Sequence, residues 1–382
     1  MQNTILAVLV SVLSLGVDSM QAQSNTKIKV QQAFEKMLEK DDIHNGFLHI
    51  QSADGALDWT FVDGAFKDGT VVSEANPFHA ASIGKMFTAA LIVKLGEEGK
   101  LKLDDPISAH LPAEIVSGLH VYEGVDYAPQ ITIAQLLQHT SGLPDYIMDT
   151  PKDGSPNIMA LALQNPDKFW EVEEFLAFSK EKLSAHFPPG QGYYYTDTEY
   201  VLLGLIIEAK YQKELHQVLL AELFEPLTMK NTAMFKRSET ISPSARLAEL
   251  YVDKTEISTY ESLSIDWAGG GLTTTTEDLL KFQRALFSGE IVSKAFLDKM
   301  QNWHKESEGM YYGFGLRKVD FRALSSALPP MTIIGHSGAN ASFAFYCPEL
   351  KVYMAGTFNQ TNQVEDTIRF LIATLITLKI DG

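Results

Sequence analysis

The run FHAASIGKMFTAALIV spans residues 78–93. After Lys85, residues 86–93 are apolar or small on every side of a helical projection. A helix that is apolar all round is buried between other layers rather than lying on a surface. The run therefore predicts a central helix in a layered domain, with Ser82 at its N-terminus and Lys85 one turn later.

Ser82 and Lys85 have the spacing that one proton transfer needs. Residues three apart on a helix share a face, where an amine can take the proton of a hydroxyl group. The free amide groups of a helix N-terminus favour developing negative charge, and burial makes a lysine lose its proton more readily. The alternative is that Ser82 is an ordinary helix cap and Lys85 extends to solvent. The two residues by themselves leave both interpretations open.

Other chemistries have little support in the sequence. There is no His-Glu-x-x-His motif, no phosphate-binding Gly-x-x-x-x-Gly-Lys loop, no Gly-x-Gly-x-x-Gly and no Gly-x-Ser-x-Gly. We expect no metal and no cofactor. The Ser-x-x-Lys spacing occurs twice more in polar surroundings, at Ser24/Lys27 and Ser179/Lys182.

Composition narrows the class of partner. The 382 residues are 45% hydrophobic and 21% charged, as in a soluble globular protein, and the net charge is −17. An acidic surface repels phosphate backbones, so nucleic acid is not an expected partner. The single cysteine, Cys347, excludes an internal disulfide. We expect a monomer acting on a small-molecule or peptide substrate.

The first 22 residues are typical of an export signal. The apolar run 5–17 is too short to span a bilayer, and small residues lead to Ala22. This predicts a signal peptide over 1–22 and a secreted or periplasmic protein. Residues 1–4 lack Lys and Arg, and the alternative is a buried N-terminal helix. Residues 370–380 predict a C-terminal helix packed on a sheet, and no membrane span is predicted.

Strand signals lie at both ends of the chain and helix signals between them. Residues 46–64 predict a hairpin with a turn at Asp54-Gly55, and 342–346 and 352–358 predict paired strands. The middle third is rich in helix signals. We predict an α+β fold with an antiparallel sheet built from both chain ends, flanked by helices, and an inserted, mostly helical lobe. A single domain over 23–382 would divide into a sheet lobe (about 23–105 and 265–382) and a helical lobe (about 106–264).

Further blocks follow the opening run in a fixed order. They are GKLKLDDP (99–106), ITI (131–133), LL (136–137), HTSGLP (139–144), PG (189–190), YTD (195–197), LLG (202–204), PLTM (226–229), GGGL (269–272) and GHSG (335–338). With the run at 78–88, this series resembles the class C β-lactamase-like serine hydrolases, over about residues 40–380. That group includes penicillin-binding D-Ala-D-Ala carboxypeptidases, D-aminopeptidases and β-lactamase-fold esterases. The resemblance implies a β-lactamase/transpeptidase-like fold.

The resemblance also implies catalytic roles. Ser82 matches the acylated nucleophile, Lys85 its helix partner, and Tyr195 the tyrosine that acts as general base with the lysine. A phenol can act as a general base only if positive charge lowers its pKa or the lysine shares its proton. A packed aromatic is the alternative for Tyr195. The backbone N–H groups of Ser82 and Ala339 match the oxyanion hole.

Two departures from the family pattern bear on the substrate. Asp197 stands where the family often has Asn, and an ionised carboxylate cannot donate to a substrate carbonyl; it can instead pair with Lys85. His336-Ser337-Gly338 replaces Lys-Thr-Gly, so a titratable ring takes the place of a permanent cation. The substrate-binding residues implied are Asp197, His336, Ser337, Gly338 and Ala339.

These departures favour a D,D-peptidase-like or esterase-like serine hydrolase that cleaves an amide or ester bond through an acyl-enzyme on Ser82. The alternatives are a class C-type β-lactamase and a non-catalytic penicillin-binding or sensor protein on the same fold.

Overall fold

A computed structural model describes residues 23–243 and 245–381. The predicted signal peptide, 1–22, lies outside the described residues. The fold is built on an eight-stranded antiparallel sheet in the order β10-β11-β12-β13-β14-β15-β1-β2. Its strands are β1 (Asn45–Ser52), β2 (Asp58–Gly64), β10 (His304–Ser307), β11 (Met310–Tyr312), β12 (Arg317–Asp320), β13 (Thr332–Ser337), β14 (Phe343–Cys347) and β15 (Val352–Thr357). The predicted α+β class, with a sheet drawn from both chain ends, is confirmed.

The hairpin at the N-terminus joins the sheet through β15. Strands β1 and β2 pair with Ile50 opposite Trp59, and β1 also pairs antiparallel with β15, where Leu48 lies opposite Gly356. Strand β14 also pairs antiparallel with β15, where Ala344 lies opposite Ala355. Both strand pairs predicted from the sequence, β1–β2 and β14–β15, are therefore present, and they are neighbours in the same sheet.

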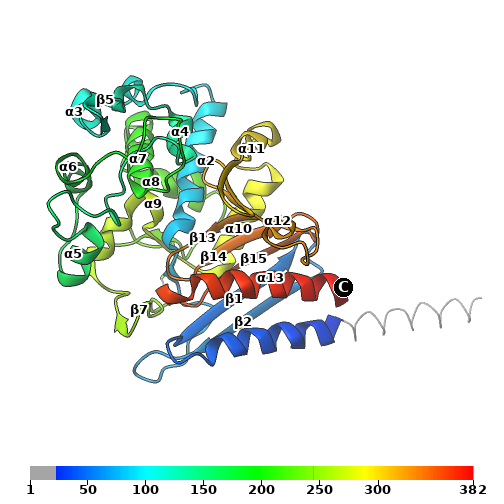
Figure 1. The fold of residues 1–382 in the computed structure, drawn as a ribbon. Helices are drawn as coiled ribbons and strands as arrows, with labels where there is room; N and C mark the ends of the chain where they lie inside the picture. The colour runs from blue at the N-terminus through cyan, green and yellow to red at the C-terminus, as the bar shows by residue number, and fades with distance from the viewer. Residues whose placement is uncertain (1–22, 244, 382) are drawn as a thin grey trace, which may run out of the picture.

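Each face of the sheet packs against a different set of helices. Phe343 and Phe345 of β14 lie in a core with the helix over residues 23–38 and α13 (Val364–Asp381). Ala344 and Tyr346 point to the opposite face, toward α10 (Thr276–Ser288). This alternation follows from the two-residue period of a strand. Figure 1 shows the blue N-terminal helix and the red α13 side by side on one face of the sheet.

The predicted central helix is α2 (Gly84–Glu97), and its residues from Gly84 to Val93 are all buried. Helices between the β2 and β10 segments form the rest of the second layer and the upper part of the molecule in Figure 1. They are α3 (Ala113–Val116), α4 (Ile133–Leu137), α5 (Ile158–Gln164), α6 (Val172–Lys182), α7 (Asp197–Tyr211), α8 (Leu215–Leu219), α9 (Trp267–Gly270), α10 and α11 (Lys294–Met300); α12 (Phe321–Leu324) follows β12. A small sheet, β3-β9-β6, joins Phe78–His79, Leu272–Thr274 and Ala233–Met234. The exact division into two lobes stays a prediction.

Candidate active site

The nucleophile candidate lies on a strained turn ahead of the central helix. Ser82 is in a short 3-10 helix, Ala81–Ile83, that leads directly into α2. Ala81 has φ of 47°, a left-handed conformation that a residue with a side chain rarely adopts. The hydroxyl group of Ser342 donates to the carbonyl of Ala80 at 2.8 Å, which ties the turn to β14. Such strain persists only where the surroundings hold it, as they do at many functional sites.

Lys85 is completely buried and directed at three oxygen atoms. Its Nζ atom donates to Oγ of Ser82 at 3.2 Å and to the carbonyl of Gly269 at 3.2 Å, and it contacts Oδ1 of Asp197. Burial lowers the pKa of Lys85, but the charges of Asp197 and Asp266, among others, outweigh it and raise this pKa above its ordinary value. The lysine is therefore an ammonium group at rest. Asp197 pairs with it, which is one of the two possibilities the sequence left for this carboxylate.

Two glycines let α9 approach the nucleophile turn. A Cβ atom on Gly84 would lie 2.7 Å from Cα of Gly270, and one on Gly270 would lie 2.5 Å from the carbonyl carbon of Ala81. Real Cβ atoms essentially never come that close, so both positions require glycine. This approach is what brings the carbonyl of Gly269 to Lys85.

Further carboxyl groups surround the ion pair. Asp145 accepts a hydrogen bond from the N–H of Asp197 at 3.3 Å, and the half-buried Asp266 lies near Lys85. Burial and the charge of Asp197 raise the pKa of Asp145 to about 8 and that of Asp266 to about 7. Glu199 is also buried, and burial raises its pKa well above the ordinary value. The ammonium group of Lys85 thus lies among several carboxyl groups.

Tyr195 lies against the same lysine. It lies two residues before the start of α7, and its ring centre is 4.9 Å from Nζ of Lys85 and 5.7 Å from the guanidinium carbon of Arg317. Burial raises the pKa of Tyr195 to about 12, although both cations act to lower it. The phenol is therefore protonated at neutral pH. The structure brings Tyr195, Lys85 and Ser82 together as the sequence predicted, while their roles stay a prediction.

The third motif packs against the nucleophile turn. A Cβ atom on Gly338 would lie 2.8 Å from Cβ of Ala81, so the turn after β13 touches the turn that carries Ser82. Ser337 is nearly buried, whereas Ala339 is exposed beyond the strand. The exposed position of Ala339 suits a backbone N–H that is open to substrate.

His336 does not lie where a substrate-binding ring would. It is completely buried; its Nδ1–H donates to the carbonyl of Ser337 at 2.8 Å, and Nε2 accepts from the hydroxyl of Tyr312 at 2.8 Å. Burial lowers the pKa of His336 well below its ordinary value, and the nearby charges of Arg317 and Lys85 lower it further. The expectation of a titratable ring that contacts substrate therefore needs correction, because this ring is neutral and both of its nitrogen atoms are occupied.

Sequence reasoning missed a cation beside the third motif. Arg317 on β12 lies opposite Gly335 of β13, and its Nη1 donates to Oγ of Ser337 at 3.1 Å. Glu306 on β10 binds the other side of the guanidinium. No motif marks either residue, and only the order of the strands brings them to Ser337.

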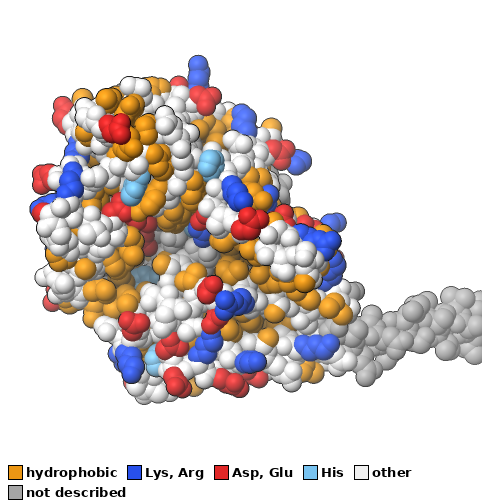
Figure 2. Space-filling view, viewed as in Figure 1, with side chains coloured by type: hydrophobic (Ala, Val, Ile, Leu, Met, Phe, Trp, Pro, Cys, Tyr) orange, Lys and Arg blue, Asp and Glu red, His pale blue; other side chains and the backbone are white. Residues whose placement is uncertain are grey.

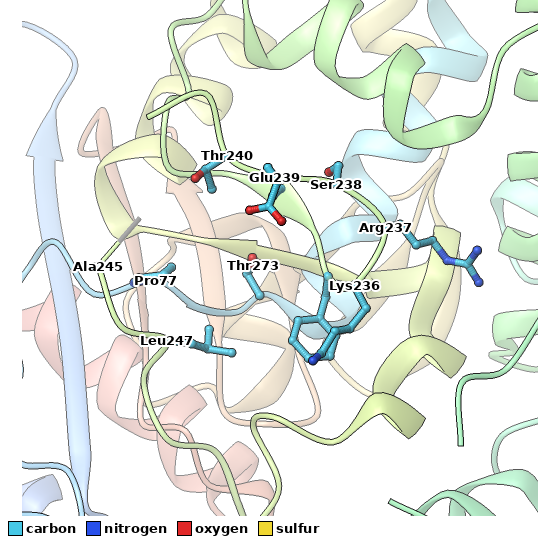
Figure 3. Close-up of a pocket in the computed structure, with 11 residues that line it drawn as sticks. Pro77, Lys236, Arg237, Ser238, Glu239, Thr240, Ala245, Leu247 and Thr273 are labelled. Atoms are coloured by element: carbon cyan, nitrogen blue, oxygen red, sulfur yellow. The ribbon is translucent and has the colours of Figure 1, made fainter. Parts of the chain in front are cut away.

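The surface is hollowed between the helical part of the chain and the sheet (Figure 2). A separate cavity of about 570 Å³ lies beside β6 and the loop that follows it, lined among others by Pro77, Leu247 and Thr273. Figure 3 shows the side chain of Arg237 directed away from these residues. None of the predicted site residues lines this cavity.

The family model named Beta-lactamase matches residues 46–376. The chain belongs to the beta-lactamase family. Within this family, penicillin-binding protein 4* of Bacillus subtilis is 28% identical over 333 residues, which are 83% of this chain and 67% of that protein. Protein flp of Staphylococcus aureus is 30% identical over 218 residues, 55% of this chain and only 39% of flp.

Solved structures agree with this assignment. A D-stereospecific amidohydrolase from Streptomyces superimposes with a TM-score of 0.72 at 25% identity, over 89% of this chain and 96% of that one. D-amino acid amidase from Ochrobactrum anthropi, complexed with D-phenylalanine, gives 0.79 at 22% identity, over 94% and 100%. The beta-lactamase family member described here thus has the fold of the penicillin-binding serine hydrolases. In the described part of the chain, no helix is long and apolar enough to cross a membrane.

Proposed function

We propose that this protein cleaves amide or ester bonds through an acyl-enzyme on Ser82. The observation that carries the proposal is the placement of Nζ of Lys85 at 3.2 Å from Oγ of Ser82, at the start of a buried helix, with the ring of Tyr195 against the same amine. A serine hydroxyl becomes a nucleophile when a neighbouring group can take up its proton, and an amine and a phenol both lie in this cluster.

The reaction has two halves. Oγ of Ser82 attacks the carbonyl carbon and its proton passes to the Tyr195–Lys85 pair, while the backbone N–H groups of Ser82 and Ala339 stabilise the oxyanion. The carbon–nitrogen or carbon–oxygen bond breaks, and the leaving amine or alcohol takes up that proton. Water then attacks the acyl ester, which releases a carboxylic acid and restores Ser82.

The resting charges assign different tasks to the two proton carriers. Lys85 is an ammonium group paired with Asp197, so it holds the Ser82 hydroxyl and stabilises the alkoxide as it forms. The proton acceptor is then Tyr195 in its phenolate form, or Lys85 after it has given a proton to Asp197. In this proposal His336 positions Ser337 and Tyr312 rather than contacting substrate.

A peptidase-like or esterase-like substrate fits the site better than a β-lactam. Asp197 is occupied by Lys85 and offers no N–H to a substrate carbonyl, and the third motif contributes a neutral, buried ring in place of a cation. The names of the structural neighbours, a D-stereospecific amidohydrolase and a D-amino acid amidase, also support amide substrates of D-configured residues.

Labelling of Ser82 tests the proposal. Native protein and the Ser82→Ala variant are incubated with a fluorophosphonate and analysed by intact mass, then assayed on a D-Ala-D-Ala peptide, a D-amino-acid amide, nitrocefin and a p-nitrophenyl ester. We expect one adduct on the native protein, none on the variant, and turnover of a peptide, amide or ester that the variant lacks. A native protein without adduct would favour a non-catalytic binding protein, and nitrocefin as the best substrate would favour a β-lactamase.

A further inference from the structure

The side of the site formed by Ser337 holds a guanidinium group that is already paired. The Arg317 side chain is only 14% exposed, and Nη1 donates to Oγ of Ser337 at 3.1 Å. The Nε and Nη2 atoms donate to the two carboxylate oxygens of Glu306, at 2.8 and 2.7 Å. Parallel, two-point pairing of this kind is the strongest that arginine makes with a carboxylate.

A local irregularity of the sheet aims Glu306 at this arginine. Along the β10–β11 pair, Lys305 lies opposite Tyr311 and Ser307 opposite Met310, so Glu306 is left out of the register. A bulge of this type redirects a side chain. The Glu306 carboxylate is directed across β11 and is only 15% exposed.

The other ionisable groups around the site offer a substrate anion no partner either. Among the described residues that contact Ser82, Tyr195 or Ser337, Lys85 is paired with Asp197 and Arg317 with Glu306. His336 has both ring nitrogen atoms occupied. A substrate carboxylate placed beside Ser337 would therefore lose its water next to Glu306 and gain no free cation in return.

We propose that Glu306 determines substrate charge preference: by occupying Arg317, it makes the site select a substrate whose arm beside Ser337 is uncharged, an amide or ester, over one that carries a free carboxylate there. This inference rests on the proposed function and names its substrate class. A substrate bound with its carbonyl at Ala339 has one of two arms beside Ser337, the leaving group or the acyl group, and the test covers both.

Two matched pairs of thioesters measure the preference. N-acetyl-D-alanyl thioglycolate and its thioglycolamide differ in charge on the leaving arm, and N-succinyl- and N-acetyl-D-alanyl thioglycolamide differ on the acyl arm. Thiol release gives kcat/KM for each, and rates are normalised to hydrolysis by hydroxide. Within one preparation, the ratio of the two kcat/KM values does not depend on how much protein is correctly folded.

We expect the wild-type protein to prefer the neutral member of one pair by about tenfold or more, and Glu306→Gln to reduce that preference by about tenfold. The control is Glu308→Gln, because Glu308 has the same charge two residues away but is 75% exposed and pairs with Lys305; its ratio should match wild type. In Glu306→Gln, the freed guanidinium of Arg317 should raise kcat/KM for the substrate that carries the carboxylate. The double variant Glu306→Gln/Arg317→Gln lacks this guanidinium and should lose that increase.

Three results would overturn the inference. The wild-type protein could prefer the charged member of a pair and show no preference for a neutral member in the other pair; wild type and Glu306→Gln could have equal kcat/KM ratios; or Glu308→Gln could shift the ratio as much as Glu306→Gln does. Failure of the proposed function looks different. It appears as absence of a fluorophosphonate adduct on Ser82, or as thioester turnover that is absent in wild type or persists in Ser82→Ala.

Discussion

Lys85 and Asp197 form an ion pair that is almost closed to solvent, since the lysine side chain is 0% exposed and the aspartate side chain 10%. The pair determines the protonation state of the amine that holds Ser82. Burial by itself would favour a neutral lysine, and the carboxylate reverses that preference.

Asp197→Asn should therefore make the site active at lower pH. The substitution removes a negative charge that raises the pKa of both Lys85 and Tyr195, so both values should fall. We expect the midpoint of the pH profile for acylation of Ser82 by a fluorophosphonate to move in the acid direction. Asp149→Asn is the matched control, because the Asp149 carboxylate bonds His186 and Tyr194 instead of the lysine. A midpoint that stays in place or moves to higher pH would contradict the role of the pair.

Tyr195→Phe should lower kcat/KM by about 10²–10⁴-fold, the contribution typical of a positioned proton acceptor. Since the pKa of Tyr195 is raised to about 12, the phenolate becomes more abundant with every pH unit above neutral. The wild-type rate should rise with pH accordingly, and the rise should be absent in the variant. Tyr194→Phe removes the neighbouring hydroxyl, which bonds Asp149, and should keep the wild-type profile. Equal losses in the two variants would exclude a specific role for Tyr195.

The sequence predicts those parts of the fold that depend on continuous apolar patterns. The uninterrupted apolar run after Lys85 could only be a buried helix, and it is α2. The alternation in residues 46–64 and 342–358 predicts two strand pairs, both of which are present. For the site, the order of the sequence blocks predicts that Ser82, Lys85 and Tyr195 come together, and they do.

The remainder depends on contacts that no local pattern encodes. Strands β10 and β12 are four residues long and rich in charged side chains, and β11 has only three residues, so they lack a strand signal. Arg317 reaches Ser337 only because β12 pairs with β13, and Glu306 reaches Arg317 only because of the bulge in β10. The sequence also leaves the environment of His336 open, since it is the register with neighbouring strands that buries the ring.

Asp266→Asn should remove a loss of stability that the wild-type protein undergoes as pH rises from acid toward neutral. Burial raises the pKa of Asp266 from its ordinary 3.8 to about 7, so the folded state holds this proton more tightly than the unfolded state. The resulting stability is complete below the unfolded pKa and is lost as pH rises through the folded value. Between pH 3.8 and about pH 7 the free energy of unfolding should fall by up to about 1.4 kcal/mol per pH unit for this group, and above that range, where both states have lost the proton, this contribution no longer changes.

Denaturation midpoints measured from pH 5 to pH 8 should therefore fall less steeply between pH 5 and pH 7 in Asp266→Asn than in wild type. Asp54→Asn provides the comparison, because Asp54 is exposed and hydrogen bonds from Ser52 and Ala56 lower its pKa, which keeps it ionised across this range. Parallel curves for wild type and Asp266→Asn would show that Asp266 does not carry the buried proton.

Gly270→Ala should damage both stability and the site. The new Cβ atom would lie 2.5 Å from the carbonyl carbon and oxygen of Ala81 and from Oδ2 of Asp266, so α9 would have to move away from the nucleophile turn. We expect a loss on the order of 1–3 kcal/mol or more, as in overpacked cores, together with slower labelling of Ser82. Gly96→Ala is the matched control in α2, because its Cβ would meet only ordinary contacts at 3.6 Å and alanine favours a helix by up to about 1 kcal/mol. Gly270→Ala should therefore melt at a lower temperature than wild type and label Ser82 more slowly, whereas Gly96→Ala should melt at a higher temperature. A Gly270→Ala protein with unchanged melting and labelling would show that α9 does not set the position of Ser82.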